Sequence, residues 1–173
     1  KTYNDGKLII GNSVTLDSDF KGTFDLNSAD YEQYRNISAE LGKKAVKLTG
    51  DEDDNILIGG KSKDELRGGD NNDTLNGGKG NDSLWGGDGA DTFVYKAGEG
   101  TDTIMDYNYD DGDLLKILDK NGKKISKPIK NSSFSGDDLT LSIKGGGKLI
   151  LAGVTTAAKI NVNGSELSFT TTR

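Results

Sequence analysis

Large apolar residues recur every nine positions through the middle of the chain, each set among polar and small residues. Five consecutive nine-residue units begin at Gly50, and a sixth unit, Ala97 to Met105, follows after an offset of two residues. The last three residues of each unit predict a minimal strand whose middle side chain faces away from its two neighbours. Such a period predicts a solenoid with a narrow core built from the eighth position of each unit. These residues are Leu57, Leu66, Leu75, Leu84, Phe93 and Ile104.

The polar part of each unit is also regular, and its template is Gly-Gly-x-Gly-x-Asp-x-U-x, where U is the apolar residue. Glycine permits positive φ angles and close backbone approach, so the first half of a unit is expected to curl into a tight loop with inward carbonyl groups. A flexible linker would have a similar composition, but a linker does not keep glycine, aspartate and leucine in phase through five units. The sixth position holds Asn55, Asp64, Asp73, Asp82, Asp91 and Asp102.

These loops offer only oxygen as a metal ligand. The chain has no cysteine and no histidine, which excludes disulfides, thiolate chemistry and the usual zinc ligands. Carboxylates and carbonyl groups from two neighbouring loops suit calcium, which takes about six to eight oxygen ligands. Magnesium demands stricter octahedral geometry and loses its water reluctantly, so the pattern favours calcium.

The repeats resemble the RTX (repeats-in-toxin) calcium-binding nonapeptides of proteins exported by bacterial type I secretion, from Gly50 to about Asp113. The resemblance implies an all-β fold in which two consecutive repeats form one turn of a right-handed parallel β-roll, with each calcium between loops two repeats apart. Two loops depart from the pattern, because Asn55 is uncharged and because Ser62 and Lys63 replace a glycine and a small polar residue. The implied pairs are Asp64 with Asp82, Asp73 with Asp91, Asp82 with Asp102 and, less closely matched, Asn55 with Asp73.

The resemblance therefore implies about three to four calcium ions, with the strongest sites in the third to fifth repeats. The expected ligands are the sixth-position aspartates and the glycine-rich loop residues before them. The aspartates are Asp64, Asp73, Asp82, Asp91 and Asp102, and the loop residues are Gly59, Gly60, Gly68, Gly69, Asn71, Gly77, Gly78, Gly80, Gly86, Gly87 and Gly89.

The flanking segments predict β caps on the two ends of this roll. Residues 1–49 show short apolar pulses separated by turn-forming residues and are expected to continue the roll backwards without calcium, although a helix over Ala29 to Leu41 is an alternative. Residues 50–113 are expected to form the roll, and residues 114–173 an antiparallel β cap that holds a secretion signal if Arg173 is the natural end of the protein. The segment Tyr95 to Ile117 resembles the closing part of such rolls, where a terminal cation site and a solvated acidic loop are both open alternatives. The residues concerned are Asp106, Asp110, Asp111 and Asp113.

The negative charge of the chain is concentrated on the repeats. Residues 50–113 carry 17 acidic and five basic residues, whereas residues 114–173 carry four acidic and ten basic residues. Stacked turns would bring the carboxylates together in a partly dehydrated place, where they repel one another unless a cation is present. We therefore expect calcium binding and folding to be one event.

These observations favour a non-catalytic calcium-binding module of a secreted, extracellular or cell-surface bacterial protein. We expect it to fold on calcium binding outside the cell, to support type I secretion through the secretion machinery, and to stabilise the rest of a larger parent protein. A glycan-binding or adhesive module is the alternative, with Trp85 as a candidate stacking residue, although packing against a neighbouring strand or tyrosine is the favoured explanation for that residue. A catalytic site, a nucleic-acid partner and a membrane span are not expected, because no catalytic constellation, nucleic-acid-binding module or long apolar run is present.

Overall fold

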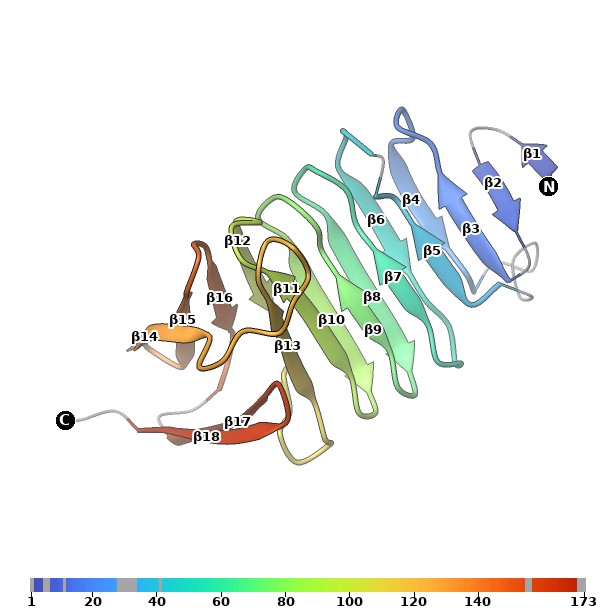
Figure 1. The fold of residues 1–173 in the computed structure, drawn as a ribbon. Helices are drawn as coiled ribbons and strands as arrows, with labels where there is room; N and C mark the ends of the chain where they lie inside the picture. Colours follow the sequence, from blue (N-terminus) through green and yellow to red (C-terminus); the bar gives the residue numbers. More distant parts are fainter. Residues whose placement is uncertain are drawn as a thin grey trace.

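The computed structural model describes residues 2–4, 7–10, 12–27, 34–40, 42–154 and 157–170, and every helix or strand among them is a β-strand. No described segment forms a helix of the length and apolarity needed to cross a membrane. The strands form two sheets that run the length of the molecule from the N-terminal to the C-terminal end (Figure 1). The all-β prediction is therefore confirmed for the described residues.

The first sheet has ten strands, and the second has eight. In spatial order the first contains β1 Thr2–Asn4, β2 Lys7–Ile10, β3 Ser13–Leu16, β5 Asn36–Ser38, β7 Ile56–Ile58, β9 Thr74–Asn76, β11 Thr92–Lys96, β13 Leu114–Leu118, β17 Ala157–Val162 and β18 Ser165–Thr170. The second contains β14 Ile129–Ser135, β15 Asp138–Ile143, β16 Lys148–Leu151, β12 Thr101–Ile104, β10 Ser83–Asp88, β8 Glu65–Asp70, β6 Val46–Thr49 and β4 Gly22–Asp25.

Consecutive repeats alternate between the two sheets, so two repeats make one turn and parallel strands pair with their equivalents one turn away. In the first sheet Leu57 is in register with Leu75, and Leu75 with Phe93. In the second sheet Leu66 is in register with Leu84, 18 residues later. The predicted parallel β-roll is thus confirmed, and its pitch follows directly from the nine-residue period.

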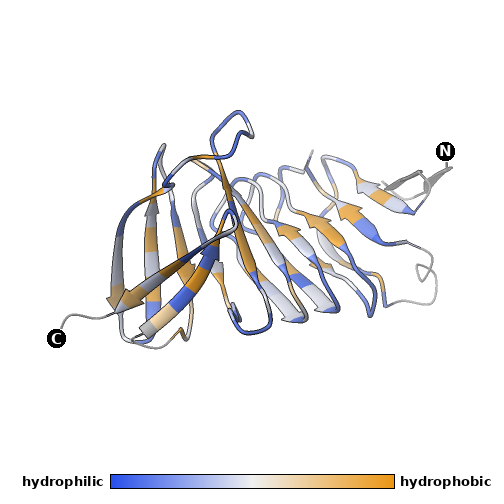
Figure 2. Ribbon diagram, turned by 60° about the horizontal axis from the view of Figure 1, so that its bottom comes forward, coloured by the Kyte–Doolittle hydropathy of each residue, from blue (hydrophilic) through white to orange (hydrophobic). Residues whose placement is uncertain are grey.

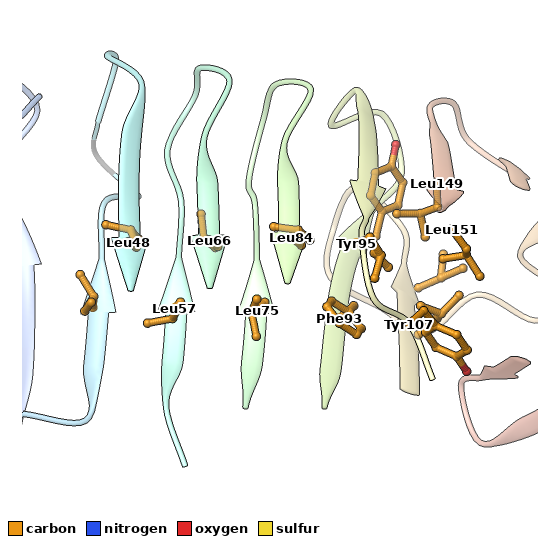
Figure 3. Packing of buried hydrophobic residues seen from close by; sticks show 14 of the residues in the cluster. Leu48, Leu57, Leu66, Leu75, Leu84, Phe93, Tyr95, Tyr107, Leu149 and Leu151 are labelled. Carbon is orange, nitrogen blue, oxygen red and sulfur yellow. The ribbon is translucent and has the colours of Figure 1, made fainter. Parts of the chain in front are cut away.

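The eighth-position side chains form the core between the sheets. Figure 3 shows Leu57, Leu75 and Phe93 stacked along one sheet, facing Leu66 and Leu84 on the other, and all five are at most 1 % exposed. Hydropathy alternates accordingly, with apolar bands on the strands and polar residues in the connecting loops (Figure 2). Burial of a leucine side chain contributes roughly 2 to 3 kcal/mol, so this column is a main source of stability.

The N-terminal strands extend the roll and then close it. Strands β4, β5 and β6 continue the parallel sheets, whereas β1, β2 and β3 are joined by antiparallel pairing. The helix considered for Ala29 to Leu41 is wrong where the structure can be described, because Asn36–Ser38 is strand β5. Residues 28–33 and Leu41 lie outside the described part. A strand places Ile37 in register with Val14 and Leu57 and buries it completely, which a helix there would not do.

The C-terminal residues form the predicted antiparallel cap. Strands β14, β15 and β16 form an antiparallel meander, and β16 joins the second sheet in parallel with β12. Strands β17 and β18 form a hairpin that extends the first sheet beyond β13. Each sheet of the roll therefore ends in its own antiparallel extension (Figure 1).

Candidate metal centre

The loops between strands lie at two edges of the roll because the chain passes from one sheet to the other and back. We use the word loop for the first six residues of each repeat and for residues 105–113, although the ends of some of these segments belong to strands β8, β10 and β12. Loops 50–55, 68–73, 86–91 and 105–113 lead from the second sheet to the first, and loops 59–64, 77–82 and 97–102 lead back. Loops one turn apart are joined through their backbones: the Asp70 N–H donates to the Asp51 carbonyl at 3.1 Å, and the Lys79 N–H donates to the Gly60 carbonyl at 3.0 Å. Each edge is therefore a stack of loops in register.

The sixth-position carboxylates form a ladder along each edge. Oδ1 of Asp82 accepts the backbone N–H of Asp64 at 2.8 Å, one turn earlier. The equivalent bond joins Asp91 Oδ1 to the Asp73 N–H at 2.8 Å. The structure thus brings together all four pairs that the resemblance implied, since Asp102 accepts from the Asp82 N–H at 3.1 Å and Asp73 from the Asn55 N–H at 2.7 Å.

Asp113, which the sequence placed only in a candidate terminal cation site, is a further member of this ladder. Asp113 Oδ1 accepts the Asp91 N–H at 2.9 Å, and Asp113 is 3 % exposed. It lies 22 residues after Asp91, so the nine-residue period does not reach it. The signal was nevertheless present, because Asp113 precedes the buried Leu115 by two residues, as in every repeat.

The loops are of two kinds, which differ in whether the second carboxylate oxygen of the sixth-position aspartate has a hydrogen-bond partner. Among the described side chains, Oδ2 of Asp73, Asp82 and Asp91 is buried and has no hydrogen-bond partner. A buried, unpaired carboxylate oxygen is costly, and a native structure keeps one only when a proton or a cation compensates it. These three aspartates belong to the third, fourth and fifth repeats.

The first glycine of each of these repeats borders the unpaired oxygen. A methyl group on Gly68 would lie 2.0 Å from Asp73 Oδ2 and 2.5 Å from the carbonyl oxygen of Gly86, one turn later. Equivalent methyl groups on Gly77 and Gly86 would lie 2.4 Å from Asp82 Oδ2 and 2.0 Å from Asp91 Oδ2. Glycine is therefore required here to let oxygen atoms from two turns converge, not to provide positive φ.

Positive φ occurs instead at the second and fourth positions of these three loops. This conformation is accessible to glycine and tolerated by asparagine, which explains Asn71 at a fourth position. The second-position angles are 126° at Gly69, 84° at Gly78 and 99° at Gly87, and the fourth-position angles are 68° at Asn71, 138° at Gly80 and 125° at Gly89. We call loops 68–73, 77–82 and 86–91 the open loops.

The first two repeats have closed loops, 50–55 and 59–64, in which no residue has positive φ. The Gly60 N–H donates to Asp64 Oδ2 at 2.6 Å, so the oxygen that is unpaired in the open loops is satisfied. This difference coincides with Ser62 and Lys63, the residues that depart from the template. The carbonyl oxygen of Gly77 still approaches Gly59, at 2.2 Å from a methyl group placed there.

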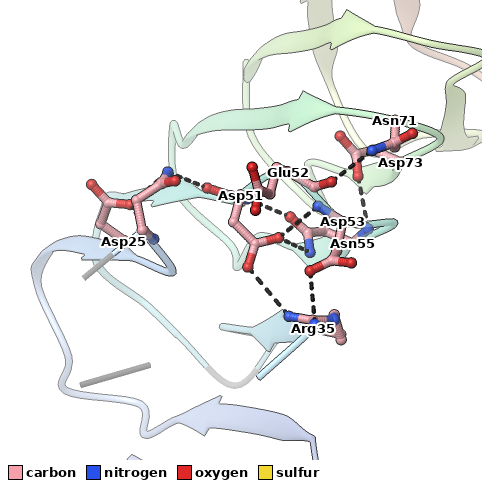
Figure 4. Close-up of polar contacts among 10 residues, drawn as sticks. Asp25, Arg35, Asp51, Glu52, Asp53, Asn55, Asn71 and Asp73 are labelled. Atoms are coloured by element: carbon pink, nitrogen blue, oxygen red, sulfur yellow. Dashed lines mark hydrogen bonds and ion pairs between the residues drawn. The ribbon is translucent and has the colours of Figure 1, made fainter. Parts of the chain in front are cut away.

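Side-chain hydrogen bonds and ion pairs hold the first closed loop (Figure 4). Asn55 Oδ1 accepts the Asp51 N–H at 2.7 Å, and its Nδ2 donates to Asp51 Oδ1 at 3.0 Å. The guanidinium of Arg35 lies 2.7 Å from Asp53 Oδ2 and 3.5 Å from Asp51 Oδ2. A side-chain amide and a guanidinium thus supply the hydrogen bonds and positive charge within this loop.

Burial makes the ladder carboxylates poor acids when no cation is present. Desolvation is the largest cause, and it raises the pKa of Asp73 and Asp82 to about 7 and that of Asp91 to about 6. Desolvation and the neighbouring charge of Asp82 raise the pKa of Asp102 to about 8. Each shift reflects a buried negative charge that a cation would stabilise.

The donor set fits a hard cation held largely by the backbone. Among the described residues, no group of three or more acidic side chains is arranged to hold a metal ion. An ion at an open loop would therefore meet one carboxylate oxygen and several carbonyl oxygens, a set that suits calcium's flexible coordination. The open loops are the part of the structure that fits this requirement.

The acidic segment before β13 does not gather into a further side-chain site. Asp106 accepts the N–H groups of Gly86 and Gly87 at 2.9 and 3.1 Å, while Asp110 and Asp111 are exposed. Asp113 belongs to the ladder. Asp111 and Asp113 both accept hydrogen bonds from Asn108, but the four carboxylates considered for a terminal cation site do not form a group of three or more ligands.

Trp85, the candidate glycan-stacking residue, packs against a neighbouring strand. The guanidinium carbon of Arg67 lies 3.9 Å from the centre of the Trp85 ring. Arg67 and Trp85 are in register on β8 and β10. The arginine covers one face of the ring, so the contact favours packing.

Comparison with known protein families identifies the repeat region. Residues 49–84 and 67–104 match the model of the RTX calcium-binding nonapeptide repeat, in four copies. The central part of the chain is therefore a calcium-binding β-roll, and residues 49–104 are RTX repeats. No curated protein matches the chain significantly.

Proposed function

We propose that this chain is a non-catalytic module of a secreted bacterial protein, and that calcium completes its fold outside the cell. The observation that carries the proposal is the set of three buried, unpaired oxygens of Asp73, Asp82 and Asp91, each next to a glycine. A roll with these oxygens unpaired is destabilised, whereas one with a divalent cation at each oxygen is not.

The calcium ligands that we propose are the open-loop aspartates, together with carbonyl groups of the loops stacked on them. Asp102 and Asp113 belong to the same ladders and complete the last turn on each edge. Closed loop 50–55 needs no ion of its own because Arg35 and Asn55 satisfy it. This gives three ions centred on the open loops, the lower end of the number expected from the sequence.

The remainder of the chain serves the roll in this proposal. Residues 1–49 and 114–173 are caps that cover the ends of residues 50–113, because an exposed end of a solenoid leaves strand edges and core side chains in water. Proteins with RTX repeats are typically secreted by bacteria. A module that is incomplete at low calcium and folds at the higher calcium outside the cell would support type I secretion and then stabilise its parent protein.

Calcium titration of the metal-stripped chain, followed by far-UV circular dichroism, tests the proposal. We expect a gain of β signal with calcium at about 10⁻⁴ to 10⁻³ M, the range of extracellular modules, and no gain with magnesium. Asp82→Ala should weaken the response, whereas Asp137→Ala, which alters an exposed turn of the cap, should not. The proposal would be contradicted if the metal-free chain already gave the full β signal and calcium did not change its melting temperature.

A glycan-binding function has less support, because Arg67 occupies one face of the only tryptophan. The same titrated protein can be screened for binding and turnover on a panel of neutral and uronate oligosaccharides. Calcium-dependent binding that is lost in Trp85→Ala would favour the glycan function.

A further inference from the structure

The two edges of the roll carry opposite charge outside the sixth-position residues. On the edge formed by loops 50–55, 68–73, 86–91 and 105–113, which we call the acidic edge, the other positions hold nine carboxylates and no base. On the edge formed by loops 59–64, 77–82 and 97–102, the basic edge, they hold three lysines and one carboxylate. The period of the sequence hides this segregation, because consecutive repeats fall on opposite edges.

Most of these charges are exposed and have no oppositely charged partner. Glu52, Asp54, Asp70 and Asp88 are exposed on the acidic edge, where ion pairs among the described residues involve only Asp51 and Asp53, both with Arg35. On the basic edge Lys61, Lys63 and Lys79 are exposed and make no ion pair within the described part of the chain. No ion pair therefore neutralises these exposed charges.

The negative charges of the acidic edge reach its buried oxygens, whereas the charges that act on Asp82 of the basic edge, after burial, are those of Asp64 and Glu99. After burial, the pKa of Asp73 is raised further by the negative charges of Asp91, Asp54 and Asp51. That of Asp91 is raised by Asp113, Asp106 and Asp111. The same negative charges attract a divalent cation at this place, with about twice the energy with which they repel a carboxylate.

We propose that the acidic edge binds calcium first and the basic edge last, and that Lys61 and Lys79 set the calcium concentration at which the roll is completed. The proposal rests on the proposed function, since it assumes that open loops on both edges hold calcium. Open loops 68–73 and 86–91 lie within an excess of carboxylates. Open loop 77–82 instead carries Lys79 and stacks on loop 59–64, which carries Lys61 and Lys63, although its other neighbour, loop 97–102, carries Glu99. Because each turn spans both edges, the roll is complete only when Asp82 has its ion.

The proposal assigns a function to side chains that are not ligands. Lys61 and Lys79 occupy the third position of their repeats, where the acidic-edge repeats carry Glu52, Asp70 and Asp88. Removing two unit charges near a divalent ion changes its affinity by about three- to ten-fold at low ionic strength. High salt shortens the Debye length to roughly 3 Å at 1 M and should abolish the effect.

The test is a calcium titration of the full 173-residue chain, followed by NMR of the glycine amides. Gly69, Gly87 and Gly89 report on the acidic edge, and Gly78 and Gly80 on the basic edge. The titration is repeated at about 0.01 M and about 1 M monovalent salt. The variants are Lys61→Gln with Lys79→Gln, and Asp70→Asn with Asp88→Asn. The control pair, Lys116→Gln with Lys130→Gln, removes two exposed lysines from strands β13 and β14.

At low salt we expect the acidic-edge glycines to reach their calcium-bound positions at a lower calcium concentration than the basic-edge glycines. Lys61→Gln with Lys79→Gln should lower the calcium midpoint of the basic-edge glycines about three-fold or more. Asp70→Asn with Asp88→Asn should raise the calcium midpoint of the acidic-edge glycines, and both shifts should vanish at high salt. Equal midpoints for the two edges, or a lysine shift no larger than that of the control pair, overturns the proposal. A wild-type chain in which calcium moves no glycine signal would instead refute the proposed function itself.

Discussion

Gly68 lies next to the unpaired oxygen of Asp73: a methyl group on Gly68 would be 2.0 Å from Asp73 Oδ2. The same methyl group would be 2.5 Å from the Gly86 carbonyl oxygen of the next turn. Two oxygens from different turns thus meet at a point that only a residue without a Cβ leaves empty. This relationship explains why the repeat needs glycine at its first position although the backbone there does not have positive φ.

Gly68→Ala should therefore impair both packing and calcium binding. The methyl group must displace Asp73 Oδ2 or a backbone carbonyl, which in a close-packed site costs roughly 1 to 3 kcal/mol. It also occupies the space between two proposed ligands, so we expect the calcium midpoint of folding to rise at least about ten-fold. Circular dichroism during calcium titration measures this.

Gly122→Ala is the matched control for that substitution. Gly122 has a φ of 80°, but no atom lies within 4 Å of a methyl group placed there. The control thus carries a conformational cost of about 1 to 2 kcal/mol without a clash. If Gly68→Ala leaves the calcium midpoint no higher than Gly122→Ala does, the two oxygens are not calcium ligands.

The eighth-position column should dominate the stability of the calcium-loaded roll. Leu75 is completely buried between Leu57 and Phe93, so Leu75→Ala removes its burial energy and leaves a cavity, at a cost of roughly 3 kcal/mol or more. Ile56→Ala on strand β7 is the control, because Ile56 is 44 % exposed and its loss should cost well under 1 kcal/mol. Urea unfolding in excess calcium gives both values, and similar losses for the two variants would contradict the assignment of the core.

The period of the sequence predicted a solenoid, because a nine-residue unit with one apolar side chain has few ways to bury it, and the resemblance to RTX repeats supplied the β-roll with two repeats in each turn. The same period located the carboxylate ladder, and the departures at Asn55 and Ser62 correctly marked the two loops that differ. The place of Asp113 in the ladder was missed because the last loop, 105–113, has nine residues where the other loops have six. The resemblance had already paired the loops, but which carboxylate oxygens stay unpaired depends on individual hydrogen bonds that the sequence does not show, such as that from the Gly60 N–H to Asp64 Oδ2.

The amide of Asn55 should be necessary for the calcium-independent closed loop. In Asn55→Asp, the donor to Asp51 Oδ1 is replaced by a second carboxylate, and a hydrogen bond becomes a repulsion. We expect the metal-free chain to lose roughly 1 to 3 kcal/mol, the cost of an unsatisfied buried polar pair. Calcium should restore part of this loss by neutralising the new charge, so stability must be measured by urea unfolding in both chelator and calcium.

Asn72→Asp serves as the comparison, because Asn72 is exposed on the same edge and uses its oxygen to accept the Ala90 N–H at 2.9 Å. An aspartate retains that acceptor and adds the same charge. A loss of stability in Asn72→Asp equal to that in Asn55→Asp would show that added charge, rather than the lost amide donor, is responsible.

The ladder carboxylates should give metal-free and calcium-loaded protein opposite responses to pH. Burial raises the pKa of Asp73 and Asp82 to about 7 in the folded state, against about 4 in the unfolded chain, so the folded state binds more protons between these values. Without metal, stability should therefore fall as pH rises from about 4 to about 7, and the β signal at pH 5 should exceed that at pH 7.5. With limiting calcium the order should reverse, because the ion must displace those protons. Circular dichroism at both pH values measures this. Asp82→Asn cannot titrate at that position, so it should reduce the change in β signal of the metal-free chain between the two pH values. A metal-free chain that gains stability between pH 5 and pH 7.5 would show that these carboxylates are not protonated in the folded roll.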